Sequence, residues 1–131
     1  MSIAKWCVLA ACLLPIATVA LAKIKAARLS RKNGGFDNNH PREWEAKLSG
    51  WQHRANAAQA NGFEALPLFI AGVVFAQMAH ADQSRIDFLA MAFVGIRVAY
   101  VAAYLANQGT LRSLIWCAGV GVCIALLALG A

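Results

Sequence analysis

The sequence predicts an all-α integral membrane protein made of a single bundle of four transmembrane helices. Hydrophobic residues make up 60% of the 131 residues and charged residues only 14%, whereas soluble domains are about 45–50% apolar and about 25% charged. Four apolar segments alternate with polar connectors, and each is near the roughly 20 residues that cross the ~30 Å core of a bilayer. Eight of the twelve lysines and arginines fall within residues 23–54, so one connector holds most of the positive charge.

The first predicted span covers residues 6–22, a run without charged side chains. Pro15 lies within it and is tolerated, because neighbouring helices re-satisfy the carbonyl group that a proline frees. A cleaved signal peptide is the alternative, since Lys5 precedes the run and Ala20-Leu21-Ala22 resembles a cleavage site. Positive charge follows the run far more than it precedes it, which is the reverse of a signal sequence, so we predict a retained helix.

A long polar loop is predicted at residues 23–50. It opens with five basic residues, continues through the helix breakers Asn33-Gly34-Gly35, and then has a cluster of turn-forming residues that ends at Pro41. After Pro41, residues 42–48 are expected to begin a short helix. Loops of this length are usually functional or mobile, so this segment is the one substantial extramembrane element that the sequence predicts.

The remaining spans are predicted at 51–79, 86–106 and 113–131. The first of these three is polar in its first half and apolar in its second, so a helix of this length extends beyond the bilayer at its polar end. The next span carries Arg97 near its middle, and the last has no charged residue. Short polar turns join them.

Charge asymmetry predicts the orientation of the bundle. Arg112 lies on the same side of the membrane as the long loop, whereas Lys5 and Arg85 lie on the opposite side. The positive-inside rule therefore places the long loop in the cytoplasm and both termini outside. The basic loop is expected to meet membrane lipids rather than nucleic acid, because no nucleic-acid-binding motif accompanies the charge.

Polar residues within the spans are the candidate functional residues, because ionisable groups in a membrane usually face the bundle interior or a wet cavity. At 100° per residue, Asn61 lies about 20° and Glu64 about 80° around the helix from Arg54, so the three share one stripe. A structural interpretation is that Glu64 pairs with Arg97 or Arg54 and locks two helices together. A functional interpretation is that the same residues bind a ligand.

A second polar group lies on the third and fourth spans. Arg97, Tyr100 and Tyr104 are spaced by three and four residues and therefore share a helix face. Arg112 and Ser113 open the fourth span. The alternatives to a functional role are an interfacial aromatic position for Tyr104 and a headgroup contact for the snorkelling side chain of Arg112.

All four cysteines lie in apolar segments. None forms a C-x-x-C pair, and no histidine lies at ligand spacing, so we predict no metal site. Free cysteine behaves as a small buried hydrophobe, and that is the role expected for Cys7, Cys12, Cys117 and Cys123.

The polar residues together resemble the signature of a known family. Residues 54–69 read R-A-x5-N-x2-E-x2-P-x-F, and residues 97–113 read R-x2-Y-x3-Y-x7-R-S. The combined pattern resembles the MAPEG family, the membrane-associated proteins in eicosanoid and glutathione metabolism. The resemblance extends from about Asn38 to the C-terminus. From Gly50 onward the chain looks most like the short bacterial members, which implies a bacterial inner membrane.

This resemblance implies a left-handed four-helix bundle that assembles as a homotrimer, with glutathione as co-substrate in a cleft between subunits. Arg112 matches the catalytic arginine that stabilises the glutathione thiolate. The other matching positions bind glutathione or support the site: Arg54, Asn61, Glu64, Tyr100 and Tyr104 as binding residues, with Arg97 and Ser113 as supporting residues.

The implied chemistry agrees with the residue types. A thiol with a pKa of about 8.5 is mostly protonated at neutral pH, and a nearby guanidinium group lowers that pKa. Arginine also pairs well with the carboxylates of glutathione. The sequence departs from the glutathione-using members at two positions: Ala57 stands where several have a second arginine, and Gln59 stands where histidine is frequent.

Three functions are compatible with these residues. The first is a glutathione-dependent transferase or peroxidase that acts on lipophilic electrophiles dissolved in the bilayer. The second is a non-catalytic MAPEG-like protein that binds lipid or a partner protein. The third is a small proton-coupled exporter that uses Glu64, which requires that carboxyl group to be unpaired.

Overall fold

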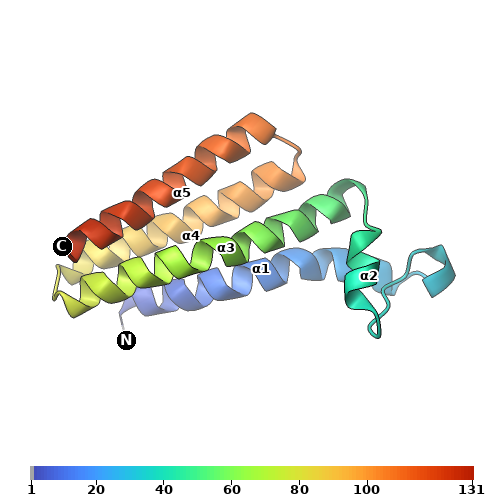
Figure 1. The fold of residues 1–131 in the computed structure, drawn as a ribbon, viewed down its shortest axis with the longest axis horizontal. Helices are drawn as coiled ribbons and strands as arrows, with labels where there is room; N and C mark the ends of the chain where they lie inside the picture. The colour runs from blue at the N-terminus through green and yellow to red at the C-terminus, as the bar shows by residue number, and fades with distance from the viewer. Residues whose placement is uncertain (1) are drawn as a thin grey trace.

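A computed structural model describes residues 2–131 as an all-α bundle in which consecutive long helices run antiparallel (Figure 1). The long helices are α1 (Ile3–Ala27), α3 (Gly50–Met78), α4 (Gln83–Leu105) and α5 (Gly109–Leu129). The loop between α1 and α3 contains the 3-10 helix η1 (Arg31–Asn33) and the short helix α2 (Pro41–Ala46). The four long helices are all long and apolar enough to cross a membrane, which confirms the predicted fold class of a single chain.

The long helices do not end where the apolar runs end. α1 continues through Lys23 and Lys25 to Ala27, because residues 22–27 contain no glycine or proline and this polar end lies beyond the hydrocarbon core. α5 begins at Gly109 rather than at residue 113, which places Arg112 inside its first turn. The 29 residues of α3 span about 44 Å at 1.5 Å per residue, so its polar start projects past a ~30 Å core.

The two short turns between helices are both built by a residue in the left-handed conformation. His80 has φ of 56° after α3, and Asn107 has φ of 59° after α4. After α4, the Gln108 amide donates to the Ala103 carbonyl at 2.9 Å and the Asn107 amide donates to the Tyr104 carbonyl at 3.1 Å. This is the Schellman arrangement, and it returns the chain sharply into α5.

Glycines lie where the helices approach most closely. A Cβ at Gly62 would lie 2.7 Å from the Pro15 side chain, which brings α3 against α1. A Cβ at Gly72 would lie 2.9 Å from the Leu126 side chain, so α3 and α5 also touch there. Beyond that point, a Cβ at Gly130 would lie 3.0 Å from the backbone of Phe75. α5 is thus held against α3 near the C-terminus, and the two helices diverge toward the loop end (Figure 1).

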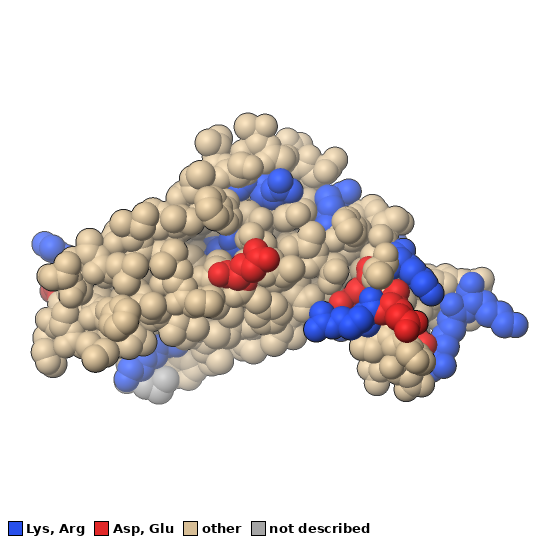
Figure 2. All heavy atoms as spheres, viewed as in Figure 1, with Lys and Arg blue, Asp and Glu red and all other residues tan. Residues whose placement is uncertain are grey.

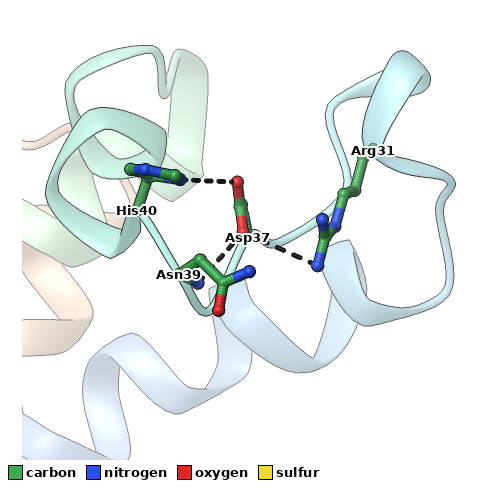
Figure 3. Close-up of polar contacts among 4 residues, drawn as sticks. All are labelled: Arg31, Asp37, Asn39 and His40. Carbon is green, nitrogen blue, oxygen red and sulfur yellow. Dashed lines mark hydrogen bonds and ion pairs between the residues drawn. The ribbon is translucent and has the colours of Figure 1, made fainter.

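The loop is folded rather than extended. The Trp44 indole donates to the Gly34 carbonyl at 3.2 Å and packs edge-on against Phe36. Asp37 accepts a hydrogen bond from the Asn39 amide at 3.0 Å and lies near both His40 and Arg31 (Figure 3). The Asn39 amide, then the two neighbouring basic groups, hold the pKa of the Asp37 carboxyl below its usual value.

Charged side chains gather at the loop end of the molecule, while the visible face of the bundle is mostly uncharged (Figure 2). This distribution matches a bundle immersed in lipid with its loop in water, since charge inside hydrocarbon is costly. The chain is therefore an integral multi-pass membrane protein.

Candidate functional site

A groove of about 610 Å³ opens between α3 and α5, where the two helices diverge. Polar side chains from three helices line it: Asn61 and Glu64 from α3, Tyr100 and Tyr104 from α4, and Arg112 and Ser113 from α5. Six of the eight site residues expected from the sequence therefore meet in one hollow. Arg97 lines a deeper extension of this groove, and Arg54 lines neither part.

One wall of the groove comes from consecutive turns of α3. Asn61 and Glu64 are three residues apart, and the Asn61 Nδ2 donates to Glu64 Oε2 at 3.4 Å. Ala57, one turn before Asn61, lines the same wall. Glu64 is exposed within a single chain although it lies in a membrane-spanning helix.

Arg97 and Glu64 do not form the predicted direct ion pair within the described residues of one chain. Arg97, only 5% exposed, instead donates from Nη2 to Asn61 Oδ1 at 2.9 Å. The amide of Asn61 thus accepts from the cation through its oxygen and donates to the anion through its nitrogen. The reason is the direction of the two side chains: Asn61 contacts Arg97 of α4, whereas Glu64 is exposed and lines the groove. This bridge also disfavours the exporter hypothesis, because Glu64 belongs to a polar network.

Arg112 lies against aromatic rings. Its guanidinium carbon is 4.4 Å from the centre of the Tyr104 ring, and the Tyr104 ring meets Tyr100 edge-on at 5.7 Å. The guanidinium of Arg97 lies 4.1 Å from the Tyr100 ring. Within residues 2–131, no carboxylate lies within ion-pair distance of Arg112. Arg112 therefore presents a cation to the groove that no acid of the same chain neutralises.

Arg54 contacts the end of a helix rather than the groove. Its Nε donates to the carbonyl oxygen of Leu105 at 3.1 Å. Leu105 is the last residue of α4, where carbonyl groups lack helical partners. Arg54 thus contacts the end of α4, from which the chain turns into α5 and Arg112.

The deeper extension of the groove is largely apolar. It has a volume of about 280 Å³ and shares Asn61, Glu64 and Trp116 with the outer part. Phe93, whose ring stacks on Phe69 with centroids 3.9 Å apart, is one of its lining residues. The polar outer groove and the apolar inner extension together suit a ligand that is polar at one end.

Trp116 and Cys117 line the groove and were not expected there from the sequence. Cys117 is exposed, so the prediction that every cysteine is buried is wrong for this residue; Cys12 is half-buried, and Cys7 and Cys123 are buried. Trp116 lies one helical turn after Arg112, and this spacing could have indicated that it lines the same groove. The position did not stand out because the rest of α5 is apolar on all sides.

Comparison with known proteins gives one match. A family model described as the MAPEG family matches residues 3–131, which is nearly the whole chain. Searches of curated proteins and of solved structures find no match.

Proposed function

The chain belongs to the MAPEG family, and from this premise we propose that it is a glutathione-dependent transferase or peroxidase acting on lipophilic electrophiles. One observation carries the proposal: Arg112, without an acidic partner in its own described chain, faces a 610 Å³ groove whose opposite wall holds Asn61 and Glu64. The family as a whole is associated with glutathione metabolism, and the groove offers groups that suit this tripeptide.

The groups in the groove match the charges of glutathione in part. Glu64 is an acceptor for the ammonium group, and Asn61 has amide donors and acceptors for peptide groups. Arg112 is a cation for the thiolate, which a guanidinium group stabilises. Ala57 leaves its wall without a second cation for a carboxylate. We therefore expect glutathione to bind more weakly here than at a site with two arginines.

Glutathione would supply the nucleophilic sulfur. Arg112 would hold that sulfur in its ionised form, and the Tyr104 ring against which the guanidinium lies would keep it in place. Charge stabilisation of this kind is often the largest contribution to catalysis. The apolar inner extension beside Trp116 would take the lipophilic electrophile, so that both reactants meet at the boundary between water and lipid.

We also propose that the protein assembles as a homotrimer. Glu64 and the groove are open in a single chain, and a charged side chain facing hydrocarbon costs roughly 2.5–3.5 kcal/mol or more at mid-bilayer. A neighbouring subunit over the α3–α5 groove would remove this cost. The proposed site would then lie between subunits.

Calorimetry of glutathione binding to the purified protein, with Arg112→Ala beside the wild type, tests the proposed function. Wild type is expected to bind and to conjugate a generic electrophile. Arg112→Ala is expected to move the pH midpoint of conjugation up toward the value of a free thiol, about 8.5. Arg112→Lys should keep part of the activity, because it retains the charge without the planar fork. An Arg112→Ala variant with the wild-type pH profile would refute the role of Arg112.

A non-catalytic member that binds lipid or a partner is the second candidate, and Ala57 favours it. Ala57→Arg separates the two functions. If glutathione binding is absent in wild type and appears in Ala57→Arg, the natural protein does not use glutathione and the non-catalytic function holds. If wild type already binds, Ala57→Arg should increase the affinity.

A further inference from the structure

The last two turns of α1, together with Arg28 at its C-cap, present an exposed stripe in which apolar residues are followed by cations. The stripe begins at Leu21 and continues three, four and seven residues later with Ile24, Lys25 and Arg28. At 100° per residue these four positions lie within an arc of about 100°. Leu21 and Ile24 are 56% and 58% exposed, and both cations are exposed as well. The stripe thus becomes cationic toward the loop end of the bundle.

Positive charge on this stripe is not neutralised by the protein. The sequence has no acidic residue before Asp37. Asp37 pairs with Arg31 and His40, and Glu45 lies near Lys23 and Arg42. By contrast, no carboxylate of residues 2–131 lies within ion-pair distance of three cations: Lys25, Arg28 and Lys32.

We propose that Lys25, Arg28 and Lys32 form a binding surface for anionic phospholipids in the leaflet next to the loop. Arg28 lies seven residues beyond Leu21, which is about 10 Å along the helix. That distance is comparable with the headgroup region of a bilayer, roughly 5–8 Å on each side. With Leu21 and Ile24 among acyl chains, Lys25 and Arg28 are therefore level with lipid phosphates, and Lys32 follows in η1 on the loop side. The gathering of charge at this end of the molecule is visible in Figure 2.

The apolar half of the stripe selects the partner. Leu21 and Ile24 lie among acyl chains, so a phospholipid in the same leaflet contacts both halves of the stripe, whereas a soluble polyanion contacts only the cations. Each basic residue near an anionic membrane surface strengthens binding about fivefold, so three together should give roughly a hundredfold preference. This surface lies outside the groove and does not depend on the proposed enzymatic function.

Trp51 is a natural reporter for the surface, because the Lys25 ammonium lies 5.3 Å from the centre of its ring. The full chain carrying Trp6→Phe and Trp116→Phe leaves Trp51 and the buried Trp44 as fluorophores. In proteoliposomes, brominated phosphatidylglycerol is expected to quench this fluorescence more than brominated phosphatidylcholine at equal mole fraction. The combined variant Lys25→Gln/Arg28→Gln/Lys32→Gln should abolish the difference.

A matched control removes charge from the opposite end of the bundle. Lys5→Gln/Arg85→Gln should keep the preference for phosphatidylglycerol, with circular dichroism showing that every variant is folded. Equal quenching by the two lipids in wild type would overturn the proposal. So would an equal loss in the control, or competition by soluble glycerol phosphate, which would assign the binding to free phosphate instead of a lipid.

Discussion

Asn61 uses both halves of its amide in one network across two helices. It accepts from the buried Arg97 at 2.9 Å and donates to Glu64 at 3.4 Å. The neutral side chain of Asn61 therefore bridges the basic Arg97 and the acidic Glu64. The polar interior should accordingly depend more on Asn61 than on the charge of Glu64.

Replacing Asn61 with leucine should lower the melting temperature in detergent by several degrees. The variant leaves the buried Arg97 without its acceptor, a loss of about 1–3 kcal/mol or more for a charged group. Glu64→Gln should have little effect, because glutamine still accepts the 3.4 Å hydrogen bond. Asn56→Leu, on the same helix and without a side-chain hydrogen bond in residues 2–131, is the control. A larger destabilisation by Glu64→Gln than by Asn61→Leu would contradict this prediction and support a direct ion pair between Glu64 and Arg97.

The sequence predicted the helix face of these residues but not their partners. Periodicity places Asn61 and Glu64 on one stripe of α3, and Tyr100 and Tyr104 on one face of α4. It does not state how far each side chain reaches toward the neighbouring helix. The pairing of Arg97 with the amide depends on that distance, which only the packed bundle determines.

Arg54 connects the start of α3 to the end of α4. Its hydrogen bond to Leu105 supplies a partner for a terminal carbonyl, in the place where basic side chains favour a helix C-terminus. Because the turn after Leu105 leads directly into the first turn of α5, Arg54 also restrains Arg112. The pattern of apolar residues could not predict the contact between Arg54 and Leu105, since this contact joins two helix ends that are distant in sequence.

Arg54→Leu should loosen the turn between α4 and α5. Hydrogen exchange of the Asn107 and Gln108 amides is expected to accelerate, because their Schellman hydrogen bonds lose an anchored helix end. Arg54→Lys should show an intermediate rate, since it keeps a donor and the charge. Arg85→Leu, at the other end of α4, serves as the control. Unchanged exchange in Arg54→Leu would show that the turn holds itself.

The folded loop should loosen in acid through Asp37. Its pKa is lowered in the folded loop, chiefly by the Asn39 amide, so its contribution is complete above the unfolded value of about 3.9. That contribution is lost as the pH falls through the folded value. Exchange of the Asn39 amide should therefore accelerate below about pH 4 relative to its intrinsic rate. Asp37→Asn should lack this additional acid dependence, and an identical profile in both proteins would contradict the prediction.

The molecule as a whole is a wedge whose opening was not predictable from hydropathy. Apolar runs identified four helices and their order. The divergence of α5 from α3 follows from close contact at Gly72 and Gly130, which holds the two helices together at one end only. A glycine permits close approach of another helix, but the sequence does not show which helix that is. The sequence therefore indicated neighbouring helices but not the groove between them.

The orientation of the wedge in the membrane decides which compartment the groove faces. Its loop end carries nine basic residues, namely eight in residues 23–54 and Arg112, whereas the opposite end has Lys5 and Arg85. This nine-to-two excess predicts a cytoplasmic loop and outside termini. The mouth of the groove near Arg112 would then open to the cytoplasm, where a water-soluble thiol tripeptide can enter while lipophilic compounds arrive through the bilayer.

Reporter fusions test that orientation directly. Alkaline phosphatase joined after Ala131 should be active, since it folds only outside the cytoplasm, and a fluorescent protein at the same position should be dark. The same reporters inserted within residues 33–39 should give the reverse pattern, because that segment is at the strongly basic end. A fluorescent protein that is active after Ala131 would show that the bundle has the opposite orientation. The groove would then face outside, and a cytoplasmic thiol could not reach Arg112.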